Sequence, residues 1–131
     1  MIFLDTGYFQ GLMNHKDTNH KNSLEIQEYL KESNEKTVIN TTVLVETLNR
    51  SIKTNILAEN MFKILKQNHQ IIKLTTGDYY KSLQVNKYFG NSINYSDCTI
   101  IHTMLERGIT RIVSFDSGFK KIDGFHVISS L

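Results

Sequence analysis

Four acidic residues stand where an apolar segment ends or a helical segment begins: Asp5, Glu46, Asp97 and Asp116. Their contexts are MIFLD, NTTVLVE, NYSDCTII and RIVSFD, which are poor surroundings for an ordinary solvated charge. If the fold brings the four carboxylates together, their mutual repulsion must be relieved. A hard divalent cation such as Mg²⁺ or Mn²⁺ relieves it, because such ions prefer carboxylate and water oxygens. The set therefore predicts metal-dependent phosphodiester chemistry.

The elements that must position these acids are short apolar runs that alternate with helical patterns. Continuous apolar runs are typical of parallel strands covered on both faces. The five predicted strands centre on residues 2–4, 38–39, 71–72, 112–113 and 127–128. Apolar residues at helical spacing predict helices around residues 26–30, 44–52, 57–65, 80–83 and 100–105. The alternation predicts an α/β fold with right-handed crossovers and a central parallel sheet.

The last of these helices has the clearest boundaries. Ser96 is the predicted N-cap and Gly108 the predicted stop. The preceding residues 88–95 (YFGNSINY) are predicted to form a loop between two helices, with Gly90 and Asn91 as its turn signal.

The fold explains how distant acids can meet. Ligands of an open parallel sheet bind outside the carboxyl ends of the strands, near the point where the strand order reverses. Asp5 and Asp116 follow the first and fourth strands, while Glu46 and Asp97 lie in the first turns of helices that start at the same end. Each acid alone is explained as a cap, a turn residue or a solvated charge. The four together predict a shared site for one or two metal ions.

At these residues the chain resembles the PIN domain, and within it the VapC-like toxin ribonucleases. The matching segments are FLDTGYF, INTTVLVETLNR and INYSDCTIIHTMLERGITRIVSFDSGFKKIDGFHVI, which together extend over essentially the whole chain. The resemblance implies a single PIN-like nuclease domain over residues 1–131, folded as a three-layer α/β/α sandwich. It also implies Mg²⁺ or Mn²⁺ as cofactor and endonucleolytic cleavage of single-stranded or structured RNA. Asp5, Glu46, Asp97 and Asp116 match the acidic positions of the family.

Hydroxyl groups lie close in sequence to the acids. Thr6, Thr42 and Ser114 are predicted to orient carboxylates or a metal-bound water, although capping explains Thr6 and Thr42 equally well. Many members of the family have threonine where this chain has Ser114, which keeps the hydroxyl. Many also have a further acid just after the last aspartate, where this chain has Ser117, and this departure weakens the case for a second metal ion.

Basic residues near the acids are candidates for binding the RNA backbone. They are Arg50, Lys53, Lys120 and Lys121, and the last two follow Asp116 closely. A solvated surface charge remains the simpler explanation for each of them. His102 and Cys98 are predicted to be structural, since no metal-binding histidine motif and no base beside the thiol are evident.

Composition excludes several other classes. The chain has 131 residues, of which 40% are apolar and 21% charged, as expected for one globular domain. A single cysteine excludes an intramolecular disulfide and a multi-thiolate zinc site. There is no apolar stretch of membrane-spanning length and no signal peptide pattern, so we expect a cytoplasmic protein without a membrane partner.

Partners and rival functions follow from the resemblance and from the residues. If the chain is a toxin, a small antitoxin protein would cover the acidic site, and the apolar helices before residue 70 favour a homodimer. An RNA-processing nuclease without an antitoxin is an alternative, and so is a catalytically inactive PIN-like module that binds RNA or protein. The complete acidic set argues against the inactive module. A receiver-like phospho-acceptor domain is disfavoured because MIFLD has no pair of acids.

Overall fold

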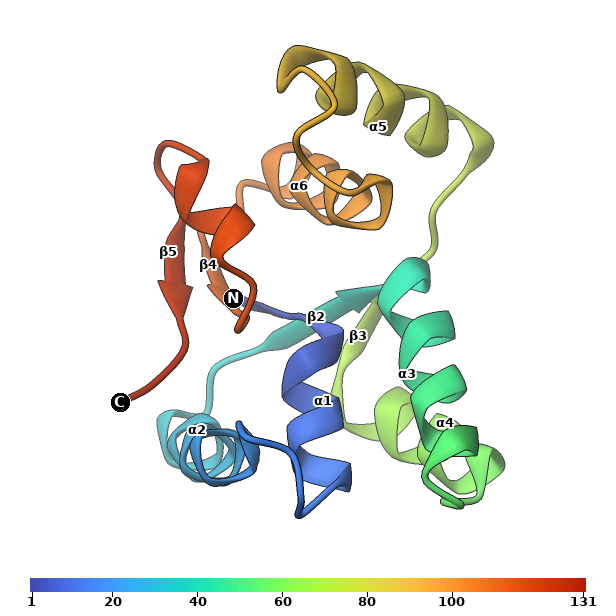
Figure 1. The fold of residues 1–131 in the computed structure, drawn as a ribbon, viewed down its shortest axis with the longest axis vertical. Helices are drawn as coiled ribbons and strands as arrows, with labels where there is room; N and C mark the ends of the chain where they lie inside the picture. Colours follow the sequence, from blue (N-terminus) through green and yellow to red (C-terminus); the bar gives the residue numbers. More distant parts are fainter.

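The computed structural model describes residues 1–131 and contains one five-stranded parallel sheet (Figure 1). Its strands are β1 (Ile2–Leu4), β2 (Thr37–Asn40), β3 (Gln70–Ile72), β4 (Arg111–Val113) and β5 (His126–Ile128). The order across the sheet is β3-β2-β1-β4-β5, and every neighbouring pair is parallel. The five predicted strands and their parallel arrangement are confirmed. The order reverses between β1 and β4, so the switch point lies between these two strands.

Six α-helices and one 3₁₀ helix connect the strands. They are α1 (Thr6–Met13), α2 (His20–Ser33), α3 (Thr41–Lys53), α4 (Ala58–Asn68), α5 (Thr76–Tyr88), α6 (Tyr95–Arg107) and η1 (Ser117–Lys121). In Figure 1, α5 and α6 lie on one side of the sheet and α1 to α4 on the other. This arrangement confirms the three-layer α/β/α sandwich. None of the helices is both long and apolar enough to cross a bilayer.

The core lies on both faces of the sheet around its central strand, β1. Ile2, Phe3 and Leu4 of β1 are completely buried, which explains why this strand is a continuous apolar run rather than an alternating one. From the other layer, α6 contributes its central turns to the core, and Cys98 is among its buried residues. The prediction that Cys98 is a small buried apolar side chain is confirmed.

Three details of the sequence-based prediction were wrong. Helix α1 was not predicted, because its eight residues are too few to show a clear helical period. The N-cap of α6 is Asn94, whose side chain accepts a hydrogen bond from the Ser96 N–H at 2.9 Å, so Ser96 itself is not the cap. In α5 the predicted apolar positions Tyr80 and Leu83 are 64% and 53% exposed, and the buried residue of that helix is Ser82.

Helices α1 and α2 approach closely at Gly11. A Cβ atom at this position would lie 2.1 Å from Ser23 Oγ and 3.1 Å from the Asn19 carbonyl oxygen. Ser23 is completely buried, so its side chain cannot move aside into solvent. We expect the Gly11→Ala variant to lose about 2 kcal/mol of unfolding free energy through overpacking, as measured by chemical denaturation.

Ser23 supplies the control for this prediction. Its hydroxyl is buried without a hydrogen-bond partner, so Ser23→Ala alone should change stability little or increase it. Combined with Gly11→Ala, the same change removes the shortest clash and should restore part of the lost stability. Additive losses in the double variant would contradict the proposed packing.

Candidate active site at the switch point of the sheet

Asp5 directly follows β1 and is held by the neighbouring strand and by the helix that it caps. Its N–H donates to the Val113 carbonyl of β4 at 3.0 Å. Its carboxylate caps α1, because Oδ1 accepts from the Thr6 N–H at 2.8 Å. The second oxygen, Oδ2, accepts from the Ser114 hydroxyl at 2.8 Å. Asp5 is only 8% exposed, so both its backbone and its carboxylate have a fixed position.

The link from Asp5 to Glu46 runs through Thr6. Glu46 lies in the second turn of α3, and its Oε1 accepts from the Thr6 hydroxyl at 3.2 Å. Thr6 is the first residue of α1, which Asp5 caps. The two carboxylates are therefore placed by one residue of α1, although they are 41 positions apart in the sequence. The side chain of Thr6 orients a carboxylate, as predicted.

Asp116 is positioned by Ser114 and by the start of η1. The Ser114 hydroxyl accepts from the Asp116 N–H at 3.0 Å while it donates to Asp5, so one buried hydroxyl joins the two acids that follow β1 and β4. Asp116 caps η1 through a 2.8 Å hydrogen bond from the Gly118 N–H to its Oδ1.

Asp97 lies in the first turn of α6, on the other side of the sheet from α3. The pKa of Asp97 is raised to about 8, mainly by burial and further by a hydrogen bond with the Asp116 carboxyl and by the charges on Asp5, Asp116 and Glu46. Burial also raises the pKa of Asp5 to about 6, with Glu46 and Asp116 adding to the effect and the Ser114 and Thr6 hydrogen bonds opposing it. Asp97 therefore lies within electrostatic range of the other three acids, and Asp5 within range of Glu46 and Asp116, which groups the four around one locus.

This locus fits a divalent cation. Four carboxylates crowd into it, two of them have pKa values well above the ordinary range, and no basic side chain forms a salt bridge with any of them. A carboxylate that binds its proton more tightly because of neighbouring negative charge also binds a metal cation favourably in place of that proton. Carboxylate oxygens are the ligands that Mg²⁺ and Mn²⁺ prefer.

A buried polar bridge, which was not predicted, sets the spacing between Glu46 and Asp97. Asn40 ends β2 and caps α3, accepting from the Val43 N–H at 3.1 Å. Its amide nitrogen donates to the Thr103 hydroxyl of α6 at 3.1 Å. Beside it, the Thr99 hydroxyl donates to Thr42 Oγ1 at 2.9 Å. Thr42 therefore joins two helices, and it makes no hydrogen bond to any of the four acids.

The bridge gives a testable expectation. Asn40→Ala removes the N-cap of α3 and the buried hydrogen bond from the Asn40 amide to the Thr103 hydroxyl. We expect a loss of about 2–3 kcal/mol of unfolding free energy. Asn68→Ala is the matched control, because Asn68 is exposed and its amide bonds only within its own helix, to the Ile64 carbonyl. Equal losses in the two variants would contradict the bridging role of Asn40.

The predicted RNA-contacting residues fall into two groups. Arg50 and Lys53 are exposed and lie four and seven residues after Glu46 on α3, and therefore on the same face of the helix. Lys120 and Lys121 are exposed on η1, which Asp116 caps. Of the four, Lys120 lines the same hollow as Asp116. Contact of all four with RNA remains a prediction.

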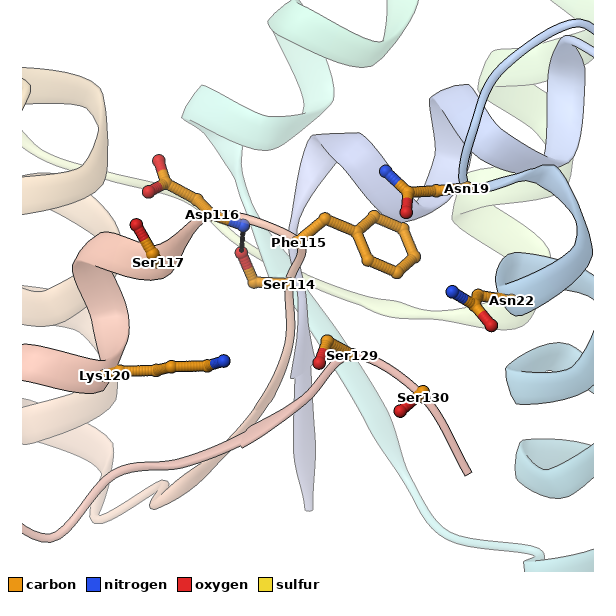
Figure 2. Close-up of a pocket in the computed structure, with 9 residues that line it drawn as sticks. All are labelled: Asn19, Asn22, Ser114, Phe115, Asp116, Ser117, Lys120, Ser129 and Ser130. Atoms are coloured by element: carbon orange, nitrogen blue, oxygen red, sulfur yellow. Dashed lines mark hydrogen bonds between the residues drawn. The ribbon is translucent and has the colours of Figure 1, made fainter.

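A hollow of about 270 Å³ opens directly beside Asp116 (Figure 2). The residues that line it, here called the switch-point hollow, are Asn19, Asn22, Ser114, Phe115, Asp116, Ser117, Lys120, Ser129 and Ser130. They come from the start of α2, the segment from β4 into η1, and the residues after β5. The hollow was not predicted, because only the fold brings these three segments together.

A second group of potential metal ligands lies away from the four acids. Asp78 of α5 and His102 and Glu106 of α6 have ligand atoms that all lie within 4.8 Å of one another, which no three of the four acids do. His102 Nε2 lies 3.0 Å from Asp78 Oδ1, so the group ties α5 to α6 without an ion. This agrees with the structural role predicted for His102. The spacing of His102 and Glu106 is visible in the sequence, but their proximity to Asp78 is not.

Comparison with known proteins supports the same assignment of fold. A family model described as PIN domain matches residues 2–125. VapC20 from Mycobacterium tuberculosis, described as a toxin that cleaves the sarcin-ricin loop, is similar with a TM-score of 0.75 and 19% identity, over 92% of this chain and 93% of that chain. VapBC2 from Rickettsia felis, solved with a DNA fragment from its promoter, is similar with a TM-score of 0.69 and 19% identity, over 98% of each chain. No curated protein matches the chain.

Proposed function

The chain belongs to the PIN domain family, and on this premise we propose that it is a Mg²⁺- or Mn²⁺-dependent endoribonuclease consisting of one nuclease domain, residues 1–131. Asp5, Asp97 and Asp116 are the principal metal ligands. Glu46 binds the metal directly or through water. The substrate is single-stranded or structured RNA.

The observation that carries the proposal is the gathering of four carboxylates from four separate elements at the switch point. Nothing in the stability of the fold requires this arrangement, since like charges at close range destabilise it. Burial is the main reason that the pKa values of Asp5 and Asp97 are raised, and the charges of the neighbouring acids add to it. Clusters of acids with perturbed pKa values are characteristic of functional sites.

The residues of the chain divide the work of phosphodiester hydrolysis. The four carboxylates create a site of high negative charge. This site repels the phosphates of RNA unless a cation is bound. Ser114 and Thr6 fix Asp5 and Glu46, so the ligand oxygens need little reorganisation. When bound, the cation supplies activation of the attacking water and offsets the charge that develops on the phosphate and the leaving oxygen. Lys120 and Lys121 bind backbone phosphates at the edge of the site.

We propose further that the nuclease is the toxin of a toxin–antitoxin pair. The similarity to VapC20 and to VapBC2 supports this assignment. A small antitoxin covers the acidic site and inserts a basic side chain among the carboxylates. Apolar side chains on α3 and α4 are exposed and would be buried in a homodimer, among them Val45 at 57%, Ile52 at 63% and Ile64 at 49%. Growth arrest on expression, relieved by a small neighbouring gene, tests the toxin assignment.

The central experiment is RNA cleavage by the purified protein. We expect cleavage in Mg²⁺ or Mn²⁺, none in EDTA, and recovery when the metal is restored. Asp97→Asn should lower the rate about 10²–10³-fold, because the lost ligand supported several kcal/mol of transition-state stabilisation. Cleavage that persists in EDTA would refute the metal-dependent mechanism.

Glu106→Gln is the matched control, because it changes the other group of potential ligands by the same isosteric replacement. It should leave the rate within about twofold of the parent. The opposite pattern, with loss in Glu106→Gln and none in Asp97→Asn, would move the metal site to Asp78, His102 and Glu106. A folded protein that binds RNA but never cleaves it would favour the inactive module.

A further inference from the structure

The residues that line the switch-point hollow differ from those of a surface that only binds a phosphate backbone. Six of its nine lining residues are asparagine or serine, and Phe115 is the one apolar residue among them. It contains one cation, Lys120, and one anion, Asp116. A surface that only attracts a polyanion has several cations and needs no amides. The composition therefore points to a neutral polar ligand with a flat face.

Phe115 supplies a fixed aromatic surface. It is half-buried, packs against the edge of the core, and lies over α1, where a Cβ on Gly7 would be 3.5 Å from its Cδ2. Because Gly7 has no side chain, the ring can lie close to the backbone of α1 while part of it stays open to the hollow. Aromatic rings of this kind stack on unpaired nucleobases, because every base has a π-face.

The two asparagines face this ring with unused hydrogen-bonding groups (Figure 2). Asn19 is the N-cap residue of α2, yet its side chain makes no capping hydrogen bond. Neither the Asn19 amide nor the Asn22 amide bonds to any other group of the chain. An asparagine at an N-cap normally satisfies the first turn of its helix. Here it presents a donor and an acceptor to the hollow, the combination that reads the edge of a base.

The position relative to the acids selects the ligand. Asp116 is one of the four acids, and both Asp116 and Ser117 line the hollow. An RNA strand whose scissile phosphate lies at the acids therefore has its neighbouring nucleotide at the hollow. Lys120 lies on the η1 side, opposite the asparagines, where it can neutralise the adjoining phosphate. The volume of about 270 Å³ is below the ~300–1,000 Å³ of sites for drug-sized ligands, which suits one base with its sugar.

Resting on the proposed ribonuclease function, we propose that the switch-point hollow binds one unpaired nucleotide beside the scissile phosphate. Its base stacks on Phe115, and the amides of Asn19 and Asn22 read its edge. The hollow thereby sets the sequence preference of cleavage and requires the substrate to be unpaired at that nucleotide.

Binding of short RNA tests this without any cleavage step. The probes are fluorescently labelled eight-nucleotide oligomers of adenosine, cytidine or uridine, titrated in Mg²⁺ against the Asp97→Asn protein and followed by anisotropy. In that background, Phe115→Leu removes the aromatic face while keeping an apolar side chain, and should weaken binding of all three oligomers about tenfold. Asn22→Ala should weaken one oligomer at least about fivefold more than the others.

The matched controls are Tyr88→Leu and Asn60→Ala, which remove an exposed aromatic ring and an exposed amide on α5 and α4. Both should bind like the Asp97→Asn parent. Thermal unfolding shows whether each variant is folded. If Phe115→Leu does not fold, Asn22→Ala still tests the inference.

Three results would overturn the inference. One is unchanged binding of every oligomer by both variants, and another is no binding of any oligomer by folded protein. The third is an equal loss for RNA and for inorganic polyphosphate, which would show that the hollow binds phosphate charge rather than a base. If the variants alter oligomer binding but the parent never cleaves RNA, the hollow is supported and the proposed chemistry fails. If cleavage occurs and the variants have no effect, the chemistry stands and the inference fails.

Discussion

At pH 8 and without divalent cations, Asp97→Asn should unfold at a higher temperature than the parent protein. The variant replaces a carboxylate by an amide of the same shape, so the packing around α6 is kept. It removes one of the negative charges that oppose each other at the switch point. A change that abolishes the proposed activity is therefore expected to stabilise the metal-free fold.

The size follows from the pKa of Asp97, which is about 8 in the folded protein against 3.8 for an ordinary aspartate. At 1.36 kcal/mol per unit of pKa, the upper bound at pH 8 is about 5 kcal/mol. Solvent screening at a partly exposed side chain reduces it to about 2 kcal/mol. For a domain of this size, that corresponds to roughly 8 °C in the unfolding temperature.

The pH dependence has a defined sign. Between about pH 4 and pH 8 the folded protein binds more protons than the unfolded chain, so its stability falls as pH rises through this window. Asp5, with a pKa of about 6, contributes in the same direction up to about pH 6. The advantage of Asp97→Asn should therefore be large at pH 8 and disappear near pH 4.

Metal ions should reverse the order of the two proteins. Mg²⁺ or Mn²⁺ binds the deprotonated carboxylates of the folded state, so it should stabilise the parent, increasingly so as pH rises, and stabilise the variant much less. Asp123→Asn is the control, because it removes an exposed acid of the loop before β5. Should this control gain as much stability as Asp97→Asn, a general effect of net charge would explain the result. A parent that is the more stable protein in EDTA at pH 8 would show that the ionised Asp97 carboxylate does not destabilise the fold.

The positions of the acids were predictable because each is attached to a strong local signal. Asp5 and Asp116 follow continuous apolar runs, and Asp97 opens an apolar helix, so their placement needed only a parallel sheet with β1 beside β4. The pairing of Leu4 with Val113 provides that neighbourhood. These local sequence patterns do not give the distances between the carboxylates. Those distances depend on α1 and on the hydrogen-bonded bridge from Asn40.

Asn40 shows why such supports escape prediction from sequence. Its residue type and position indicate a cap for α3, and the structure contains that cap. Its second role depends on the Thr103 hydroxyl, which is 63 residues later and belongs to the opposite layer. Nothing local distinguishes a capping asparagine from one that also joins two layers. The switch-point hollow has the same origin, since three segments that are far apart in sequence meet only in the folded chain.

Among the predicted hydroxyls, the structure separates those that touch an acid from the one that does not. Ser114 and Thr6 each donate to a carboxylate, whereas Thr42 accepts from Thr99. The three residues are alike in sequence terms, since each precedes or follows a strand end. Because only Ser114 and Thr6 hydrogen-bond to an acid, their removal should affect metal binding, whereas the removal of the Thr42 hydroxyl should not.

Ser114→Ala should weaken the binding of Mn²⁺ about 10–100-fold. The Ser114 hydroxyl donates to Asp5 and accepts from the Asp116 N–H, so its removal frees both acids from their fixed positions. The hydrogen bond from Ser114 also opposes the rise in the pKa of Asp5, and without it a metal ion must displace a more tightly held proton. Losses of this size are typical when a residue that orients a metal ligand is removed. Titration calorimetry with Mn²⁺ at pH 7 measures the effect without any RNA.

Two further variants separate the hydroxyl from the volume of the side chain. Ser114→Thr keeps the hydroxyl and should retain most of the affinity. Thr42→Val should destabilise the contact between α3 and α6 and leave Mn²⁺ affinity within about threefold of the parent, because Thr42 touches no acid. Both hydroxyls lie near strand ends, and only Ser114 joins β1 and β4 at their carboxyl ends. If Thr42→Val lowered Mn²⁺ affinity as much as Ser114→Ala, the metal site would depend on the general stability of the fold rather than on the orientation of Asp5.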